Sequence, residues 1–261
     1  MCVLFAAIGV HPGHALVLAG NRDEAHARPT APLARWPDAP GVVAGRDLTA
    51  GGTWLGVTDT GRWATVTNVR DPAAVRTDAR SRGALVADFL RGTDTPAAYA
   101  RLVQAAHGTY NGFNLLVGIG AEAWFASSRR PAAERLAPGV YGLSNDTLDT
   151  PWPKLTRGRD AFAAALRAGP TDPVDLLAFL HDETPAPDAD LPETGVGIGL
   201  ERVLSPLFIR GARYGTRAST ALMISDTGAI QIAEQTWGPD GARGPSADLR
   251  LGPVFSIGSG S

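Results

Sequence analysis

The first ten residues, Met1-Cys-Val-Leu-Phe-Ala-Ala-Ile-Gly-Val10, give the clearest indication of the fold. Its apolar run, residues 3–10, is rich in β-branched and aromatic residues and therefore favours a strand. His11-Pro12-Gly13-His14 follows, and a Pro-Gly pair is a strong turn signal. A second apolar run at residues 15–19 completes a predicted β-hairpin that begins almost at the first residue.

A polar segment, Gly20-Asn21-Arg22-Asp23-Glu24, comes directly after the second strand of this hairpin. A hairpin returns the far end of its second strand to the start of its first. We therefore expect Cys2 to lie beside Arg22 and Asp23. A nearby guanidinium favours a thiolate, and a carboxylate can hold an ammonium group. The ordinary alternative for such a polar segment is a solvated turn with an Arg–Asp pair.

After this hairpin, short strands and helices come in groups rather than in alternation. Helices are predicted at residues 81–90, 96–106, 153–166 and 173–180, and further strands at 42–43, 53–58, 62–69, 113–118, 121–126, 217–224 and 229–236. Proline-rich residues 28–40 and 184–194 are predicted to be loops. Hairpins at both ends with helices between them predict an α+β fold in which two mostly antiparallel sheets face each other and helices lie outside.

Length and spacing predict the domain organisation. A chain of 261 residues fits one large domain or two small ones, and no repeat or linker divides this one. Residues 1–257 are therefore predicted to form a single domain, with Gly258-Ser259-Gly260-Ser261 as a flexible tail.

Composition excludes several classes of protein. A formal net charge of −2 gives no electrostatic reason to expect a nucleic acid or an anionic membrane as partner. The single cysteine rules out an intramolecular disulfide and favours a reducing compartment. The N-terminal apolar run has no preceding Lys or Arg and is far shorter than a membrane helix, which needs about 20 residues. The expected location is the cytoplasm.

Familiar motifs for metals and nucleotides are missing. His11 and His14 flank a turn without further ligands, so a zinc site is not expected. No dinucleotide fingerprint, P-loop or Gly-x-Ser-x-Gly occurs. The glycine-rich Gly195-Val196-Gly197-Ile198-Gly199 is predicted to lend flexibility to a loop over the site.

Cys2 itself carries chemistry if Met1 is removed, as it commonly is before a small residue. The residue would then hold both a thiol, with an ordinary pKa of about 8.5, and an α-amine, with a pKa of about 8. The amine could accept the thiol proton and later protonate the leaving group, which needs no catalytic histidine. The alternative is that Cys2 is a small hydrophobic side chain in a strand.

Further segments complete a pattern that resembles the NRDE family, also called the Transport and Golgi organization protein 2 family. After Met1-Cys2 and Asn21-Arg22-Asp23-Glu24, the matching segments are Arg28-Pro29-Thr30, Gly51-Gly52-Thr53-Trp54-Leu55-Gly56-Val57, Thr67-Asn68-Val69-Arg70, Ser81-Arg82-Gly83, Gly142-Leu143-Ser144-Asn145, Pro151-Trp152-Pro153-Lys154 and Tyr214-Gly215-Thr216-Arg217. Each segment is weak by itself, but their order along most of the chain makes the resemblance strong.

That family resembles the N-terminal nucleophile (Ntn) hydrolases, particularly the penicillin V acylase and bile salt hydrolase branch. The resemblance implies a four-layer αββα sandwich and the following site residues. Cys2 would be the nucleophile, Asp23 would orient its amine, Arg22 would lie beside the thiolate, Asn68 and Asn145 would be amide donors with Asn145 a candidate oxyanion donor, and Arg217 would be a late-strand arginine near the site. Ordinary alternatives are a strand-end cap for Asn68, a turn for Asn145 and a surface charge for Arg217.

Two functions of different classes follow. The first is a cysteine-dependent amidohydrolase or acyltransferase acting on a non-peptide C–N or thioester bond of a small molecule, with no cofactor required. The second is a non-catalytic haem or acyl-CoA/lipid binding and trafficking protein, in which Cys2 and one of His11, His14 or His26 would contribute. A retained fold without catalysis is a third, since fold alone does not establish function.

Overall fold

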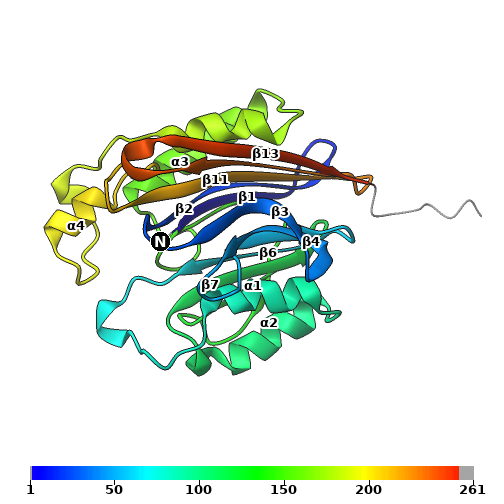
Figure 1. The fold of residues 1–261 in the computed structure, drawn as a ribbon, viewed down its shortest axis with the longest axis horizontal. Helices are drawn as coiled ribbons and strands as arrows, with labels where there is room; N and C mark the ends of the chain where they lie inside the picture. Colours follow the sequence, from blue (N-terminus) through cyan, green and yellow to red (C-terminus); the bar gives the residue numbers. More distant parts are fainter. Residues whose placement is uncertain (1, 253–261) are drawn as a thin grey trace, which may run out of the picture.

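The computed structural model describes residues 2–252 and folds them into two β-sheets with helices on their outer faces (Figure 1). The first sheet has six strands in the order β10-β1-β2-β11-β12-β13, and the second has seven in the order β3-β4-β5-β6-β7-β8-β9. Neighbouring strands in both sheets run antiparallel. The predicted tail Gly258-Ser259-Gly260-Ser261 lies outside the described residues.

The element bounds are as follows. The strands of the first sheet are β1 (Cys2–His11), β2 (His14–Ala25), β10 (Gly139–Leu143), β11 (Tyr214–Ser225), β12 (Ile230–Trp237) and β13 (Arg243–Leu251). Those of the second are β3 (Thr30–Trp36), β4 (Ala39–Asp47), β5 (Leu55–Thr58), β6 (Arg62–Asn68), β7 (Phe113–Ile119), β8 (Glu122–Ser127) and β9 (Glu134–Arg135). The helices are α1 (Arg82–Arg91), α2 (Pro96–Ala105), α3 (Pro153–Arg167) and α4 (Ile198–Val203), with a longer 3-10 segment at Pro173–His181.

These elements form four layers. Helix α3 and the 3-10 segment Pro173–His181 pack on the outer face of the first sheet, while α1 and α2 pack on the outer face of the second (Figure 1). The two sheets bury their inner faces against each other. The predicted αββα sandwich of two mostly antiparallel sheets is therefore confirmed.

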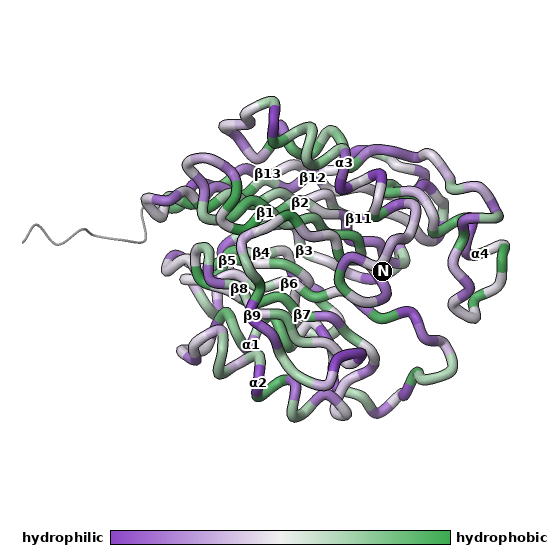
Figure 2. The backbone as a smooth tube through the Cα atoms, turned by 180° about the vertical axis from the view of Figure 1, so that it is seen from behind, coloured by the Kyte–Doolittle hydropathy of each residue, from purple (hydrophilic) through white to green (hydrophobic). Residues whose placement is uncertain are grey.

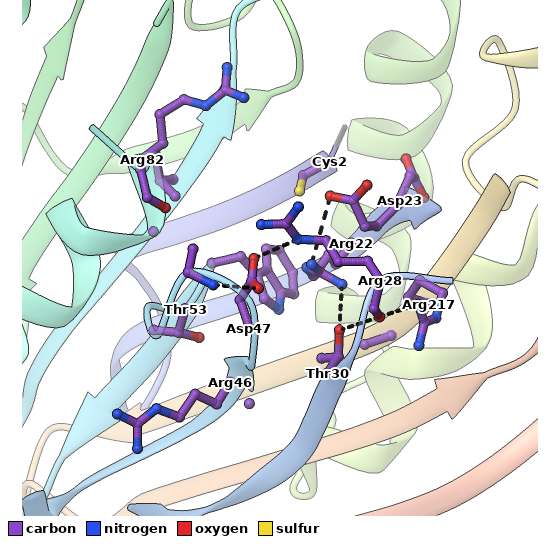
Figure 3. Close-up of a pocket in the computed structure, with 18 of the residues that line it drawn as sticks. Cys2, Arg22, Asp23, Arg28, Thr30, Arg46, Asp47, Thr53, Arg82 and Arg217 are labelled. Atoms are coloured by element: carbon purple, nitrogen blue, oxygen red, sulfur yellow. Dashed lines mark hydrogen bonds and ion pairs between the residues drawn. The ribbon is translucent and has the colours of Figure 1, made fainter. Parts of the chain in front are cut away.

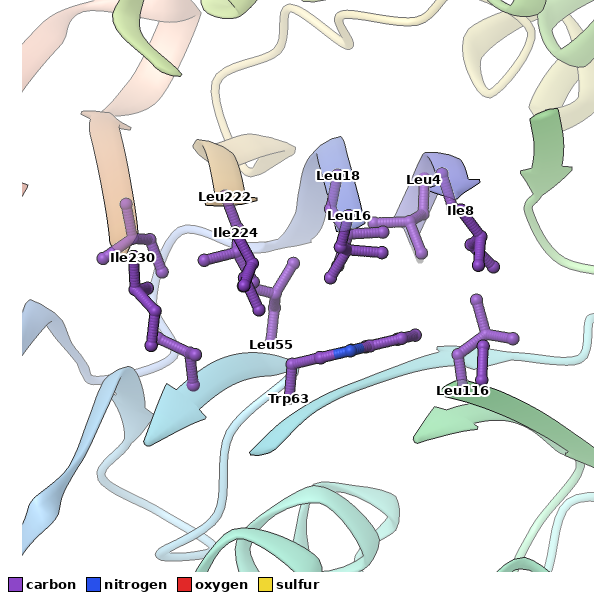
Figure 4. Close-up of a cluster of buried hydrophobic side chains, with 14 of the residues drawn as sticks. Leu4, Ile8, Leu16, Leu18, Leu55, Trp63, Leu116, Leu222, Ile224 and Ile230 are labelled. Atoms are coloured by element: carbon purple, nitrogen blue, oxygen red, sulfur yellow. The ribbon is translucent and has the colours of Figure 1, made fainter. Parts of the chain in front are cut away.

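Strand β1 is buried on both of its faces, which explains its unbroken apolar run. Leu4 and Ile8 point between the sheets toward Trp63 and Leu116 of the second sheet (Figure 4). Phe5, on the other face, packs against the α3 layer. Because Cys2 has the same parity as Leu4, its side chain also faces the space between the sheets.

Hydrophobic stretches run through the central strands, and hydrophilic stretches occupy many of the outer loops (Figure 2). Of the helices within residues 2–252, none combines the length and hydrophobicity that a transmembrane span requires.

The prediction of a proline-rich loop at residues 28–40 is wrong, because β3 and the start of β4 occupy this region. Strand β3 lies at the edge of its sheet, and its register with β4 shifts between Ala31 and Ala34. Pro32 sits at that shift, where its missing N–H interrupts no regular ladder.

The loop predicted at residues 184–194 is present, with one 3-10 turn at Asp188–Asp190, but the glycine-rich stretch that follows it differs from prediction. The glycine-rich stretch leads directly into α4, and Gly197 takes a φ of 81° just before the first helical residue, a conformation that suits glycine. None of residues 184–200 is among those lining the cavity described below, so this segment is not a loop over the site.

Strands β10 and β13, which the sequence did not predict, are the two edge strands of the first sheet.

Candidate functional site

A cavity of about 680 Å³ opens at the end of the space between the two sheets, where the apolar core gives way to polar side chains (Figure 3). Strands β1, β2, β11 and β12 supply one wall. The other wall comes from β3, β4, the segment around Trp54 and the start of α1. Cys2, Arg22, Asp23, Asn68 and Arg217, five of the six residues proposed from the sequence, line this cavity.

Cys2 is the first residue of β1 and is 7% exposed. It lies opposite Arg22 in the β1–β2 register, so the hairpin places the thiol beside the Arg22-Asp23 pair. The carbonyl oxygen of Cys2 accepts a hydrogen bond of 3.1 Å from Ser144 Oγ, which fixes the strand end. The arrangement holds a nucleophilic atom at the wall of a cavity on a rigid element.

Burial raises the pKa of the Cys2 thiol, and the Asp23 carboxylate raises it further while Arg22 opposes the shift. The thiol therefore holds its proton more tightly than an exposed cysteine does. Reaction at this sulfur requires a base that takes the proton during attack.

Asp23 is buried at the end of β2, with 2% exposure. Its Oδ1 accepts a 2.8 Å hydrogen bond from Thr216 Oγ1 of the neighbouring strand β11. Burial raises the pKa of Asp23, whereas the positive charge of Lys154 lowers it. Lys154 thus helps to keep this buried carboxylate ionised.

Lys154 comes from the first turn of α3 and is 3% exposed. Its Nζ donates a 3.1 Å hydrogen bond to the carbonyl oxygen of Leu204. Burial lowers the pKa of Lys154 to about 8, with Asp23 opposing the shift. The amine is a buried cation close to losing its proton at neutral pH.

Arg22 bridges the two walls of the cavity. Its Nη1 donates a weak 3.5 Å hydrogen bond to Thr30 Oγ1 of β3, and its Nη2 lies 3.8 Å from a carboxylate oxygen of Glu24. The guanidinium therefore spans from the strand next to Cys2 to the edge of the second sheet.

The two predicted amide donors are joined to each other. Asn145 Nδ2 donates a 2.9 Å hydrogen bond to the carbonyl oxygen of Asn68, and Asn145 Oδ1 accepts one of 3.2 Å from Ser144 Oγ. Asn68 ends β6 and lines the cavity, whereas Asn145 is 1% exposed and is not among the lining residues. The oxyanion role of Asn145 stays a prediction.

Arg217 binds three backbone carbonyl groups at and after the end of β2. Its Nη1 donates to the carbonyl oxygens of Ala25, His26 and Arg28, at 2.9, 3.1 and 3.2 Å. This single group ties the chain segment after β2 to β11. Its side chain also borders the cavity, at the side where Thr30 lies (Figure 3).

Two of the three histidines considered as partners of Cys2 lie far from it. His11 and His14 pair across the turn at the opposite end of the first hairpin, with ring centroids 5.2 Å apart. Cys2 and His11 are the two ends of β1, nine residue steps or about 30 Å of extended strand apart. These two histidines therefore cannot share a ligand with the thiol. Within residues 2–252, no histidine is among the residues that line the cavity.

Sequence reasoning gave no role to Lys154, Thr216, Ser144 or Arg82, although each stands in a segment that matches the family pattern. One signal was available, since Lys154 is the only lysine in the sequence. The contacts of the other three could not be predicted, because they depend on how distant strands and helices meet.

Comparison with solved structures defines the class of fold. The chain is similar to the crystal structure of the mutant C2A conjugated bile acid hydrolase from Clostridium perfringens, with a TM-score of 0.54, 8% identity, and coverage of 96% of this chain and 92% of that one. The αββα sandwich that begins with a cysteine-bearing strand is thus an N-terminal nucleophile hydrolase-like fold.

Comparison of sequences gives the family. The profile named Transport and Golgi organisation 2 matches residues 1–239. The Transport and Golgi organization protein 2 homologs of Bos taurus and Homo sapiens are 34% and 32% identical to this chain, and each alignment covers 90% of this chain and 93% of the relative. The chain belongs to the Transport and Golgi organisation 2 family.

Proposed function

We propose that this protein is a cysteine-dependent amidohydrolase or acyltransferase that acts on a non-peptide C–N or thioester bond, with Cys2 as nucleophile. One observation carries the proposal. A buried thiol on the first strand faces a cavity of about 680 Å³ and lies in register with Arg22, next to Asp23. A thiol that served only as core packing would not need charged neighbours at a cavity wall.

Similarity supports the same function. The bile acid hydrolase with this fold is named as a mutant in which cysteine 2 is replaced by alanine, and this chain also carries cysteine at position 2. Because the two sequences are only 8% identical, the similarity supports the fold and the position of the cysteine rather than a shared substrate.

The proposed reaction begins with removal of Met1, which gives Cys2 a free α-amine. The amine takes the thiol proton as sulfur attacks the acyl carbon, and the resulting ammonium gives that proton to the departing nitrogen or sulfur. Water or an acceptor amine then attacks the thioester at Cys2 and regenerates the thiol. Bonds and protons balance without a cofactor.

The neighbouring residues have distinct roles in this scheme. Asp23, kept ionised by Lys154 and held by Thr216, orients the α-ammonium. Arg22 stabilises the developing thiolate. The side-chain amide of Asn68 donates a hydrogen bond to the negatively charged carbonyl oxygen, with Asn145 as the candidate second donor. Losing one such donor typically costs about 3–4 kcal/mol of transition-state stabilisation.

The test uses one chain in two states. The protein carries an N-terminal tag that a protease removes so that Cys2 becomes the first residue, and hydrolysis of N-acyl amides and acyl thioesters is measured before and after cleavage. We expect activity after cleavage only, and a loss of at least about a hundredfold in Cys2→Ser. Equal turnover before and after cleavage, or in Cys2→Ser, would rule the mechanism out.

A further inference from the structure

We propose that the substrate carries an anionic group, a carboxylate or a phosphate, which is held by Arg82 beside Cys2. The inference deepens the proposed function and rests on it, since it names the substrate class of the same cavity. It is carried by the distribution of charge around the cavity and by the hydrogen-bond partners of one guanidinium.

Arginines dominate the charged lining of the cavity. Seven arginines and four carboxylates are among its described residues. Most of these arginines are already neutralised by carboxylates inside or outside the cavity. The ion-paired ones are Arg22, Arg28, Arg46, Arg76 and Arg80. Arg82 and Arg217 form no ion pair within residues 2–252.

Arg217 is an unsuitable anchor for a ligand, because its Nη1 is occupied by three carbonyl oxygens. Arg82 differs. Its Nη1 donates a 3.1 Å hydrogen bond to the carbonyl oxygen of Gly112, whereas its Nε and Nη2 have no hydrogen-bond partner in the described part of the chain. These two N–H groups form the side of a guanidinium that binds two oxygens of one anion at once.

The position of Arg82 also favours strong binding of an anion. It is the first residue of α1, at the cavity wall, and is partly buried. Burial lowers its pKa, and Cys2 is the ionisable group that opposes this shift most strongly. A partly desolvated cation without a counter-ion binds an anion more strongly than an exposed one does.

Neither Glu234 nor Glu24, the two lining glutamates, forms an ion pair with Arg82. Glu234 is fully engaged in structure, since it accepts hydrogen bonds from Leu33 N at 2.8 Å and Thr220 Oγ1 at 3.1 Å, and burial raises its pKa. Glu24 lies nearest to Arg22 among the cavity arginines. The acid group that completes Arg82 therefore comes from the substrate.

The test measures binding to the full chain carrying Cys2→Ala, which cannot form a covalent intermediate. Four probes share one octanoyl chain: N-octanoylethanolamine is neutral, N-octanoylglycine carries a carboxylate, N-octanoylphosphoethanolamine carries a phosphate, and N-octanoylethylenediamine carries a cation. Calorimetry at low and high salt gives each Kd. We expect one or both anionic probes to bind about 10- to 100-fold more tightly than the neutral one, and the cationic probe to bind more weakly.

The second arm assigns the effect to Arg82. Arg82→Gln should abolish the preference, and Arg82→Lys should restore part of it, because lysine keeps the charge without the fork. Arg91→Gln, on the same helix but paired with Asp38 and away from the cavity, is the matched control and should keep the preference. Thermal melts of all variants verify folding.

A neutral probe that binds as tightly as both anionic probes would overturn the assignment, as would a preference that survives in a folded Arg82→Gln variant. The relative affinities of the carboxylate and phosphate probes tell which anion the site prefers. Because the protein carries Cys2→Ala throughout, these outcomes do not depend on whether Cys2 is a working nucleophile.

Discussion

The chemistry of Cys2 depends on two buried charges of opposite sign. Asp23 and Lys154 are 2% and 3% exposed, and each opposes the pKa shift that burial imposes on the other. Neither group would be expected to stay charged at such a depth by itself. Thr216 adds a hydrogen bond that favours the carboxylate. The pair gives the site a fixed negative group where an α-ammonium can bind.

We predict that Lys154→Met moves the acidic limb of the pH–rate profile to higher pH by about one unit. The reason is that Asp23 must be ionised, and loss of the neighbouring cation raises its pKa. Activity that is present above the pKa of Asp23 is then lost earlier as pH falls. Lys154→Arg keeps the charge and should leave the acidic limb nearly in place, so equal shifts in both variants would contradict the assignment.

The unusual pKa of Lys154 can be measured directly. Because it is the only lysine in the sequence, a protein labelled with carbon-13 at lysine gives one side-chain signal. We expect that signal to titrate near pH 8, well below the ordinary 10.5. Titration at the ordinary value would show that the amine is not desolvated next to Asp23.

The local sequence predicted the positions of only some of the site residues. The closeness of Cys2, Arg22 and Asp23 followed from one hairpin, because the turn at Pro12-Gly13 brings the end of β2 back to the start of β1. The exact pairing of Cys2 with Arg22 did not follow, because it depends on a register shift between Ile8 and His11. Lys154 and Arg82 enter from helices whose positions depend on packing between distant layers. Their side chains could be recognised in the sequence, but their contacts could not.

At the scale of elements, the β1–β2 pair holds Cys2 through very close backbone packing. A Cβ atom at Gly20 would lie 2.4 Å from the carbonyl oxygen of Val3, so no side chain fits there without a shift of one strand. The glycine lets β2 approach β1 closely two residues before Arg22.

We therefore predict that Gly20→Ala destabilises the protein by at least about 2 kcal/mol, since it forces two central strands apart. Gly41→Ala in β4 is the matched control, because nothing lies within 4 Å of its added Cβ. That control should change the free energy of unfolding by less than about 1 kcal/mol. Chemical denaturation measures both, and equal stabilities would refute the close-packing explanation.

Helix α4 is attached by a buried ion pair between Glu201 and Arg70, whose side chains are 3% and 5% exposed. Glu201 also accepts a hydrogen bond of 3.1 Å from Thr194 N. Two charges at this depth are strongly dependent on each other, because either one alone would be a desolvated, unpaired group.

We predict that Glu201→Gln lowers stability by about 3–5 kcal/mol, either globally or as local release of α4 that limited proteolysis detects. Arg202→Gln is the control on the same helix, since its pair with Asp188 is exposed to solvent and should contribute little to stability. Resistance of Glu201→Gln to denaturant and protease equal to that of the Arg202→Gln control would contradict this prediction.

The sequence predicted central strands better than edge strands. Central strand β7 and the first half of β2 were predicted because they are mostly apolar, whereas the polar second half of β2 was placed after the strand. Edge strands β3 and β13 were not, because an edge can carry proline and many exposed polar residues. These two missed strands are not buried on both faces.

At the scale of the whole molecule, the four layers explain why the site lies where it does. The apolar cluster between the sheets ends at Cys2 and Trp54, and the polar cavity begins there. Grouped hairpins in the sequence were enough to predict two facing sheets. Strand order was not predictable, because β2 pairs with β11 about 200 residues later and that pairing depends on packing of the complete chain.

The role of Cys2 as nucleophile is tested by the intact mass of the protein after brief reaction with an acyl thioester, followed by peptide mapping. We predict that the wild-type chain has lost Met1 and carries one acyl group on Cys2, which hydroxylamine removes. We predict no acyl adduct on Cys2→Ser at the same time point. A chain without Met1 that stays unmodified at Cys2, or one acylated equally in wild type and Cys2→Ala, would contradict it.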